Sequence, residues 1–490
     1  MLLRTIRWWT LGAVVVLVLG LAGAGWAGPY NLSIGLNFTG STLNDSPFIP
    51  PDTMGTVGSN HIVELVNGRY AVYNKSTGAL LQSSSLNQFW TDSGAGFAGS
   101  FSFDPRVLYD PVAQRYVAAA VDGDGDVNHF LVAVSKTSDP LAGWSGFAIS
   151  SSSDGSHWAD FPTLGMDADG IYLAANMFPV SSGSETTSLL VLPKADLYGA
   201  VPTVANKTLF EVSDPNDTGF SIQPVVDQDN TGLPARLYSS YNPGAGQMKR
   251  SSITGGISSP SLDTADGFIA HTPYGDPANA EQPGPKANIN VGDIRFSSNL
   301  IQRDGSIWGI ESVAHPSRTG AALRWFQIDE ATNALLQDHV ISDPDLDLYY
   351  GSIAVNSNGV AVIGCSGSGI SQYASSYAFL GQTQGGITQF GAPMLLKAGV
   401  ADYQQLDNIG RNRWGDYSAT VLDPNDPFTF WTFQEWASEP NPFLYGDSWS
   451  TQITQLTVSA PSPGSVPELP PVALAALGLV PLGLRLRRKR

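Results

Sequence analysis

Short runs of apolar residues, separated by turn residues, recur along the middle of the chain. Seven segments open with a polar or acidic residue near Pro or Gly and continue as a short apolar strand: PPDTMGTVG, FDPRVLYD, ADFPTLGMD, SIQPVVDQ, VGDIRFSS, YYGSIAVN and WGDYSATVLD. Each is followed by a turn of Gly, Asn or Asp and a second strand such as QRYVAAAV, then by a third such as HFLVAVSKT. Six repeats add a fourth, more polar strand, for example GFAIS. Four short antiparallel strands per repeat are typical of a β-propeller.

We therefore predict an all-β fold, a single β-propeller of seven four-stranded blades. A two-sheet sandwich is the alternative, but it would need far fewer strands. The last repeat ends at Val458 without a fourth strand, whereas residues 30–38 (YNLSIGLNF) form a strand that belongs to no repeat. We expect this N-terminal strand to close the last blade.

The first 27 residues have the pattern of a secretion signal. Arg4 and Arg7 precede an uncharged run, and small residues close the segment at Ala27. Charge, apolar core and a small-residue cleavage site in that order predict a signal peptide over residues 1–27. The alternative is an uncleaved anchor, since residues 8–27 reach the ~20 residues that a membrane-spanning helix needs.

The other end of the chain has three parts after a Pro/Ser linker at residues 460–465. Val466-Pro467-Glu468 comes first, then an apolar stretch over residues 472–484, and finally the basic cluster RLRRKR. This arrangement resembles the PEP-CTERM sorting signal, whose family pattern is Val-Pro-Glu-Pro, an apolar segment and a basic cluster. The resemblance implies an exosortase-type sorting protease as a partner, and a host that makes exopolysaccharide.

The tail departs from that pattern at Leu469, where the second Pro is usual. Its apolar stretch is interrupted by Pro481 and is short against the ~17 residues of the shortest membrane spans. We expect residues 466–490 to be a sorting signal with a short transmembrane segment and a basic tail. An ordinary C-terminal membrane tail is the alternative.

The region between the two ends, residues 28–459, is expected to be the propeller domain. Its segments PPDTMGTVG, VAVSKTSDP and RWGDYSATVLDP, the last followed by FWTFQEW, resemble a family of uncharacterised secreted bacterial propeller proteins. The resemblance implies a fold and a location, but no activity. We expect an exported protein of the cell envelope or the extracellular matrix.

Composition narrows the classes of partner. The formal net charge of -18 argues against nucleic acid and against anionic membranes, because both require a basic face. Contact with a membrane is expected only through the C-terminal tail before processing. Cys365 is the only cysteine, so the chain cannot form an intramolecular disulfide.

Polar residues open each of the seven repeats, and in a propeller these openings meet at the mouth of the central channel. The aligned positions are Asp52, Asp104, Asp160, Gln223, Asp293, Tyr350 and Asp416. Arg106, Arg295, Arg413 and Trp414 lie beside them in the sequence. A ring of carboxylates with adjacent cations and an aromatic ring predicts a site for a cation or for sugar hydroxyls. The alternative is structural, because Asp at the start of a strand often caps a turn.

A second acidic cluster lies in the turn after the strand QRYVAAAV. Alternating oxygen ligands on a Gly-rich loop suit Ca²⁺, which takes six to eight oxygens. The candidate ligands are Asp122, Asp124, Asp126 and Asn128. The spacing is not that of an EF-hand, and the alternative is a solvated acidic hairpin turn.

The common catalytic motifs are missing from the sequence: it has no HExxH, no Gly-x-Ser-x-Gly and no phosphate-binding loop. Our main hypothesis at this point is a non-catalytic binding or scaffold protein that holds a glycan, a cation or a protein at the channel mouth. The alternative is a glycoside hydrolase or lyase that uses two of the Asp residues of the ring.

Overall fold

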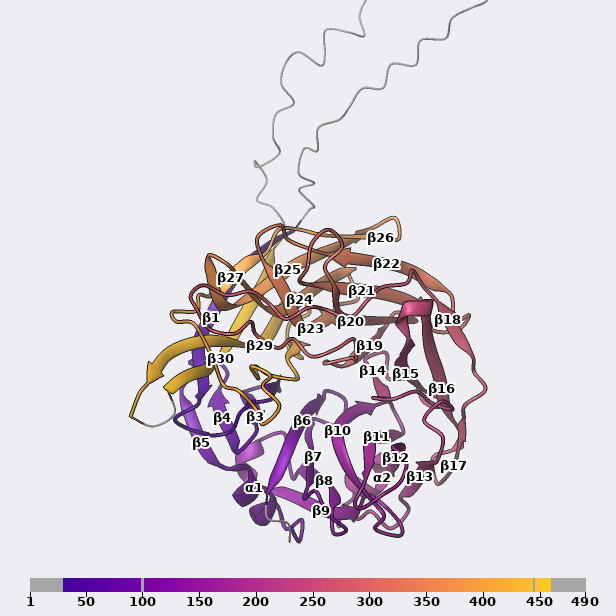
Figure 1. The fold of residues 1–490 in the computed structure, drawn as a ribbon. Coiled ribbons are helices and arrows are strands. Elements are labelled where there is room, and N and C mark those ends of the chain that lie inside the picture. Colours follow the sequence, from indigo (N-terminus) through magenta and orange to yellow (C-terminus); the bar gives the residue numbers. More distant parts are fainter. Residues whose placement is uncertain (1–29, 98–100, 444–445, 460–490) are drawn as a thin grey trace, which may run out of the picture.

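The computed structural model describes residues 30–97, 101–443 and 446–459, which form sheets arranged around a central axis (Figure 1). This is the architecture of a β-propeller, so the all-β prediction is confirmed. Within the described ranges, no helix has the length and apolar character needed to cross a membrane. The predicted signal peptide, linker and sorting tail lie outside the described residues.

The first half of the chain forms two separate four-stranded antiparallel sheets and part of a larger one. The first sheet contains β2 (Met54–Val57), β3 (His61–Val66), β4 (Arg69–Asn74) and β5 (Leu80–Ser85), followed by the short helix α1 (Leu86–Ser93). The second contains β6 (Ser102–Asp110), β7 (Arg115–Asp122), β8 (His129–Ser135) and β9 (Trp144–Ser150). The larger sheet begins with β10 (His157–Met166), β11 (Gly170–Pro179), β12 (Thr186–Pro193) and β13 (Thr208–Val212), with α2 (Lys194–Leu197) after β12.

The larger sheet continues through two further antiparallel groups. One contains β14 (Gln223–Asp227), β15 (Ala235–Asn242), β16 (Gln247–Gly256), β17 (Ser259–Asp263) and β18 (Phe268–Ala270). The other contains β19 (Leu300–Arg303), β20 (Ser306–Ala314), β21 (Ala321–Asp329) and β22 (Leu335–Ile341). Parallel pairing of the innermost strands β10, β14 and β19 joins the three groups.

Two more sheets complete the described strands. One contains β23 (Asp347–Val355), β24 (Val360–Gly369), β25 (Gln372–Gln384), β26 (Ile387–Phe390) and β27 (Met394–Lys397). The other joins both ends of the described chain, in the order β1 (Asn31–Thr42), β30 (Gly446–Ser459), β29 (Thr429–Asn441) and β28 (Ala419–Leu422). β1 pairs antiparallel with β30, with Leu32 opposite Val458 and Phe38 opposite Ile453.

Burial explains why the sequence reads as apolar runs followed by a polar strand. The second strands β3, β7 and β11 are almost wholly buried, because neighbouring sheets cover both of their faces. The outer strands β5 and β22 are largely exposed and carry the polar sequences LLQSSS and LLQDHVI. Covering both faces removes the need for alternation, which is why the central strands show continuous apolar runs.

Asp or Asn side chains hold the turn between the first and second strand in most of these groups. Each accepts hydrogen bonds from backbone N–H groups two to four residues further on, a geometry that these short side chains favour. The residues are Asp110, Asp167, Asp227, Asn356 and Asp423. The predicted turns of Gly, Asn or Asp therefore have a direct structural cause.

One predicted strand is wrong. The segment VGDIRFSS, residues 291–298, is irregular, and the innermost strand of that group begins only at Leu300. Asp293 and Arg295 consequently lie on the loop before β19.

Glu64 links three sheet elements through its buried carboxylate. Ser41 Oγ of β1 donates to it at 2.7 Å and Tyr73 Oη of β4 at 2.8 Å. Thr451 Oγ1 of β30 donates at 2.5 Å. We expect Glu64→Ala to lower the free energy of unfolding by about 2–4 kcal/mol, because it removes a buried acceptor that three hydroxyl groups share.

Equilibrium unfolding in urea measures this change. The exposed Glu185 provides the control, since Glu185→Ala removes a carboxylate without touching the core. A loss for Glu64→Ala that does not exceed the loss for the control would contradict the bridging role of this side chain.

Candidate active site

A cavity of about 670 Å³ opens where the innermost strands begin. It is lined by eight of the ten residues that the sequence predicts for ligand binding. They are Asp52, Asp104, Asp160, Asp293, Arg295, Tyr350, Arg413 and Asp416. We call this space the acidic cavity; that its residues bind a ligand stays a proposal.

Different elements bring these side chains together. Asp104 and Asp160 belong to the innermost strands β6 and β10, and Tyr350 belongs to β23. Asp52 and Asp416 lie on the loops that lead into β2 and β28. These side chains come together because the sheets are arranged around a central axis, and not because of a local sequence motif.

One unusual backbone conformation recurs where the innermost strands begin. Five residues at the start of the innermost strands adopt the left-handed conformation, with φ between 49° and 52°: Asp52, Asp104, Phe161, Ser221 and Tyr350. Non-glycine residues rarely adopt this conformation, at a cost of about 1–3 kcal/mol each, and it clusters at functional sites.

The strand register shifts at three of these residues, between β6 and β7, between β10 and β11, and between β23 and β24. Such bulges re-aim side chains and are common beside active sites. The repeated position shows that our alignment is displaced in two repeats, because the equivalent residues are Phe161 and Ser221 instead of Asp160 and Gln223.

Asn67, from the turn between β3 and β4, bridges two of the carboxylates. Its Nδ2 donates to Asp52 Oδ2 at 2.6 Å, and its Oδ1 accepts from the backbone N–H of Asp104 at 2.8 Å. Asp52 Oδ1 also accepts from the backbone N–H of Asp416 at 2.9 Å. Tyr417 Oη donates to Asp104 Oδ2 at 2.8 Å. Asp52, Asp104 and Asp416 are therefore held in fixed positions relative to one another.

Two arginines each neutralise one carboxylate of the cavity. Arg295 binds Asp293 through two N–H groups, Nε at 2.8 Å and Nη2 at 2.7 Å. Arg413 Nη2 lies 2.7 Å from Asp416 Oδ2. Burial would raise the pKa of Asp293, but its hydrogen bonds to Arg295 outweigh that effect and lower the pKa. Asp293 is consequently a carboxylate at neutral pH.

Asp160 differs from Asp293 because no arginine pairs with it. Burial, together with the charge of Asp104, raises the pKa of Asp160 to about 7. Burial also raises the pKa of Asp52, with the charges of Asp416 and Asp104 acting in the same direction. The cavity thus holds carboxyl groups of two kinds, one with a lowered pKa and others with a raised pKa.

Glu435 on β29 lies beneath this cluster and was not anticipated from the sequence. Its side chain is 4% exposed, and its Oε1 has no hydrogen-bond partner among the described residues. Burial raises its pKa, and the charges of Asp52 and Asp416 add to the effect. A lone carboxylate within the aromatic strand FWTFQEW was the only signal of it in the sequence.

Three residues that the sequence predicts at or beside the ring, Arg106, Trp414 and Gln223, do not line the cavity, because the structure buries them elsewhere. Arg106 is fully buried, stacks over the Tyr417 ring at 3.6 Å and donates from Nε to the carbonyl of Pro162. Trp414 is 1% exposed and donates from Nε1 to Ser366 Oγ.

Gln223 is also fully buried, with its Nε2 donating to backbone carbonyls, one of them Pro224 O at 2.8 Å. Arg106 and Gln223 already belong to the innermost strands β6 and β14, and Trp414 lies on a buried loop. All three side chains therefore pack into the interior.

Of the four predicted calcium ligands, Asp124 and Asp126 are exposed, whereas Asp122 and Asn128 are buried and make hydrogen bonds within the chain. Asp122 is buried and accepts hydrogen bonds from the backbone N–H of His129 at 2.6 Å and from its ring. Asn128 donates to the carbonyls of Gly125 and His157. Among the described residues, no group of three or more His, Cys, Asp or Glu side chains is arranged to hold a metal ion.

Aromatic side chains form one wall of the acidic cavity. Phe101 and Phe103 are stacked with ring centroids 5.2 Å apart, and both line the space. Phe178, which also lines it, packs against Trp158 at 5.4 Å. Aromatic faces beside hydrogen-bonding carboxylates suit the two faces of a sugar ring, one apolar and one hydroxylated.

The comparisons with known proteins concern the fold alone. No family model and no curated protein matches the chain. Among solved structures, it is similar to an alpha-L-arabinofuranosidase from Fusarium graminearum, with 11% identity over 71% of this chain and 91% of the other and a TM-score of 0.39.

Two further solved structures are similar to the chain. An arabinanase from Bacillus subtilis has 11% identity over 70% of this chain and 98% of the other, with a TM-score of 0.32. A neuraminidase-like protein from a flat-faced bat isolate has 11% identity over 64% and 89%, with a TM-score of 0.30.

The hypothesis of a non-catalytic scaffold is corrected by these findings. Several of the similar solved structures are glycoside hydrolases, among them an endo-arabinase, an alpha-L-arabinofuranosidase and an arabinanase, which is the class named in our alternative. At these identities the likeness shows the fold alone, so a function has to be inferred from the side chains of the acidic cavity.

The raised pKa of Asp160 makes stability depend on pH. The folded protein keeps this proton up to about pH 7, whereas an unfolded Asp loses it near its ordinary pKa of 3.8. The contribution of Asp160 therefore favours folding at low pH and is lost as the pH rises towards 7. We expect Asp160→Asn to be more stable than the parent at pH 8 and about equal to it at pH 4.

Urea unfolding at several pH values between these limits tests the expectation. Asp214→Asn, on an exposed loop, is the control for loss of a surface charge. Parallel pH profiles for the parent and Asp160→Asn would mean that Asp160 titrates normally.

Proposed function

We propose that this chain is a glycoside hydrolase that cleaves its substrate in the acidic cavity, with Asp160 as the general acid. The observation that carries the proposal is the pairing of a carboxyl group protonated near pH 7 with ionisable carboxylates in one open cavity. Glycosidases need this combination, because one carboxyl group must give a proton while another carries negative charge.

Asp160 would protonate the glycosidic oxygen as the bond to the leaving sugar breaks. A pKa near the working pH is the best compromise between holding the proton and giving it up. Asp160 meets this condition, and it lines the cavity where a sugar chain can reach it.

Asp104 is our candidate for the second carboxylate, which attacks the sugar or activates a water molecule. After burial, its charge contributes most to the raised pKa of Asp160, and both side chains line the acidic cavity. Tyr417 and the backbone N–H of Asp104 fix its position through hydrogen bonds.

The remaining residues of the cavity would bind and orient the sugar. Arg295 and Arg413 keep Asp293 and Asp416 in place, and their pairing limits the negative charge that the substrate meets. The stacked pair Phe101 and Phe103 offers a flat apolar surface on the neighbouring side.

Incubation with a panel of neutral and acidic polysaccharides tests the proposal. New reducing ends without ultraviolet absorbance indicate hydrolysis, whereas absorbance from an unsaturated product indicates a lyase. On the substrate that is cleaved, Asp160→Asn and Asp104→Asn should each lower kcat by at least about 100-fold, which is typical of general acid–base catalysis. Asp214→Asn should retain full activity.

The pH profile provides an independent check. Activity of the parent should fall as the pH rises through about 7, because Asp160 loses the proton that it must donate. Cleavage that survives both substitutions would show that these two carboxylates do not perform the reaction.

The ring itself supports a finer architectural proposal: seven four-stranded blades, with β1 as the outer strand of the last blade. The pairing of β1 with β30, together with the sheet order β1-β30-β29-β28, supports it. We also propose that the protein is exported, on the strength of the signal peptide pattern in residues 1–27 and the sorting tail in residues 466–490.

A variant whose mature chain begins after Thr42 tests the closing role of β1. It should unfold at a lower urea concentration and aggregate, because β30 then exposes an unpaired edge. Addition of a synthetic peptide covering residues 31–42 should restore part of the lost stability. No change on deletion would show that β1 is only an accessory strand.

A further inference from the structure

A second cavity lies at the opposite end of the strands from the acidic cavity. Its volume is about 350 Å³, within the range of small-molecule sites. It is lined where innermost strands end, at Met166 of β10 and Val226 of β14, whereas the acidic cavity lies where they begin. Because β10, β14 and β19 run parallel, the two cavities occupy opposite ends of the channel axis.

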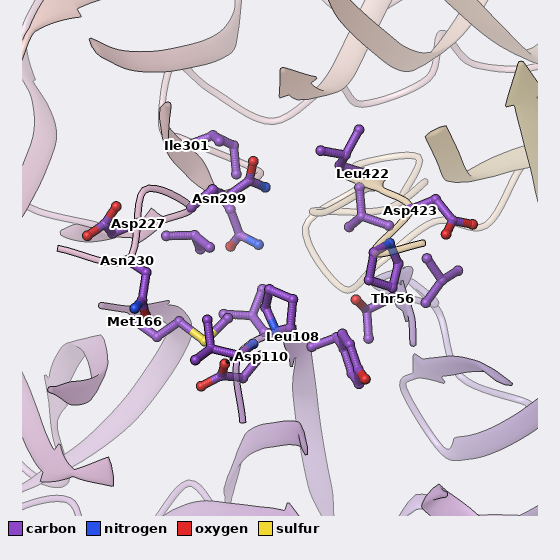
Figure 2. A pocket seen from close by; sticks show the side chains of 18 of the residues that line it. Thr56, Leu108, Asp110, Met166, Asp227, Asn230, Asn299, Ile301, Leu422 and Asp423 are labelled. Atoms are coloured by element: carbon purple, nitrogen blue, oxygen red, sulfur yellow. Dashed lines mark hydrogen bonds between the residues drawn. The ribbon is translucent and has the colours of Figure 1, made fainter. Parts of the chain in front are cut away.

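An apolar layer surrounds this second cavity. Met166, Val226 and Ile301 are in register across three neighbouring innermost strands. Leu108 and Leu422, from the ends of β6 and β28, continue the layer. Figure 2 shows Ile301, Leu422, Leu108 and Met166 around an open middle.

Asn299 brings an unused hydrogen-bond acceptor to this apolar layer. It lies directly before β19, and both Asn299 and Ile301 line the cavity. Its Oδ1 is buried and has no hydrogen-bond partner among the described residues. A buried acceptor without a partner is costly, so a donor from a bound molecule would stabilise this arrangement.

The charged side chains that line the cavity already have partners within the chain, and two of them are held by neutral groups: Arg303 donates to Gln228, and Asp227 accepts from Thr231. Lys194 lies 2.7 Å from Asp110, and Lys75 lies 2.7 Å from Asp423. An ionic ligand would have to compete with these contacts, whereas a neutral one would leave them intact. The chemistry of the cavity therefore favours an uncharged occupant.

We propose that the second cavity binds a small, mainly apolar, uncharged molecule whose single O–H or N–H group donates to Oδ1 of Asn299. The apolar layer supplies the contact area, and Asn299 selects molecules that carry a donor. This site is separate from the carboxylates of the acidic cavity and does not depend on the function proposed for them.

Phenol and toluene are suitable probes, because they have nearly the same size but only phenol has a donor. Ligand-observed NMR titrations of the full protein give the affinity of each. Both should bind the parent. Asn299→Leu should weaken phenol by about ten-fold relative to toluene, since only phenol loses a hydrogen bond. Asn299→Asp, which keeps acceptor oxygens, should retain phenol binding.

A filling substitution locates the site. Leu108→Trp should abolish binding of both probes, whereas Ile387→Trp, at an exposed position of β26, should leave binding unchanged. Circular dichroism and the urea midpoint establish that each variant is folded. The proposal is wrong if neither probe binds the parent, if the phenol-to-toluene ratio is unchanged in Asn299→Leu, or if binding persists in folded Leu108→Trp.

Discussion

The covering of each sheet on both faces by its neighbours determines where this protein can carry polar chemistry. In β3, β7 and β11 almost every side chain is buried, so a charged group in the middle of these strands would need a buried partner. Polar side chains therefore gather at the two ends of the innermost strands. At one end they form the acidic cavity, and at the other they hold the turns and the rim of the second cavity.

Within the acidic cavity, the positions of the arginines give different pKa values to carboxyl groups that would be alike in isolation. Asp293 has two hydrogen bonds from one guanidinium, which lower its pKa, while Asp160 has no such partner and its pKa is raised to about 7. The difference arises on a loop, since Asp293 and Arg295 precede β19 and are free of the strand register. An irregular segment thus provides the contrast on which the proposed reaction depends.

The sequence predicted much of the fold because each repeat carries its own information. Apolar runs, polar outer strands and Asx turns are local features, and they marked the strands and the strand of residues 30–38 that pairs with β30. The converging carboxylates followed from the alignment of repeat openings, although the left-handed residue Phe161 shows that the repeat containing Asp160 was displaced by one position.

The features of the site that could not be predicted from the sequence depend on contacts between distant segments. Asn67 reads as an ordinary turn residue, but it reaches across to Asp52 and Asp104. Arg106 follows Asp104 by two positions, yet the register shift of β6 between Phe103 and Arg106 turns it into the packed interior. No spacing rule reveals such contacts, because they are set by how neighbouring sheets lie against one another.

The pairing of Asn31 with Ser459 has a consequence for attachment. The two ends of the described chain leave the ring from the same edge of one sheet (Figure 1). A tether at either end would hold the ring by its outer edge, and the channel axis would stay clear of the point of attachment. Both cavities could then face the surroundings at once, so an immobilised ring would keep two independent openings to solution.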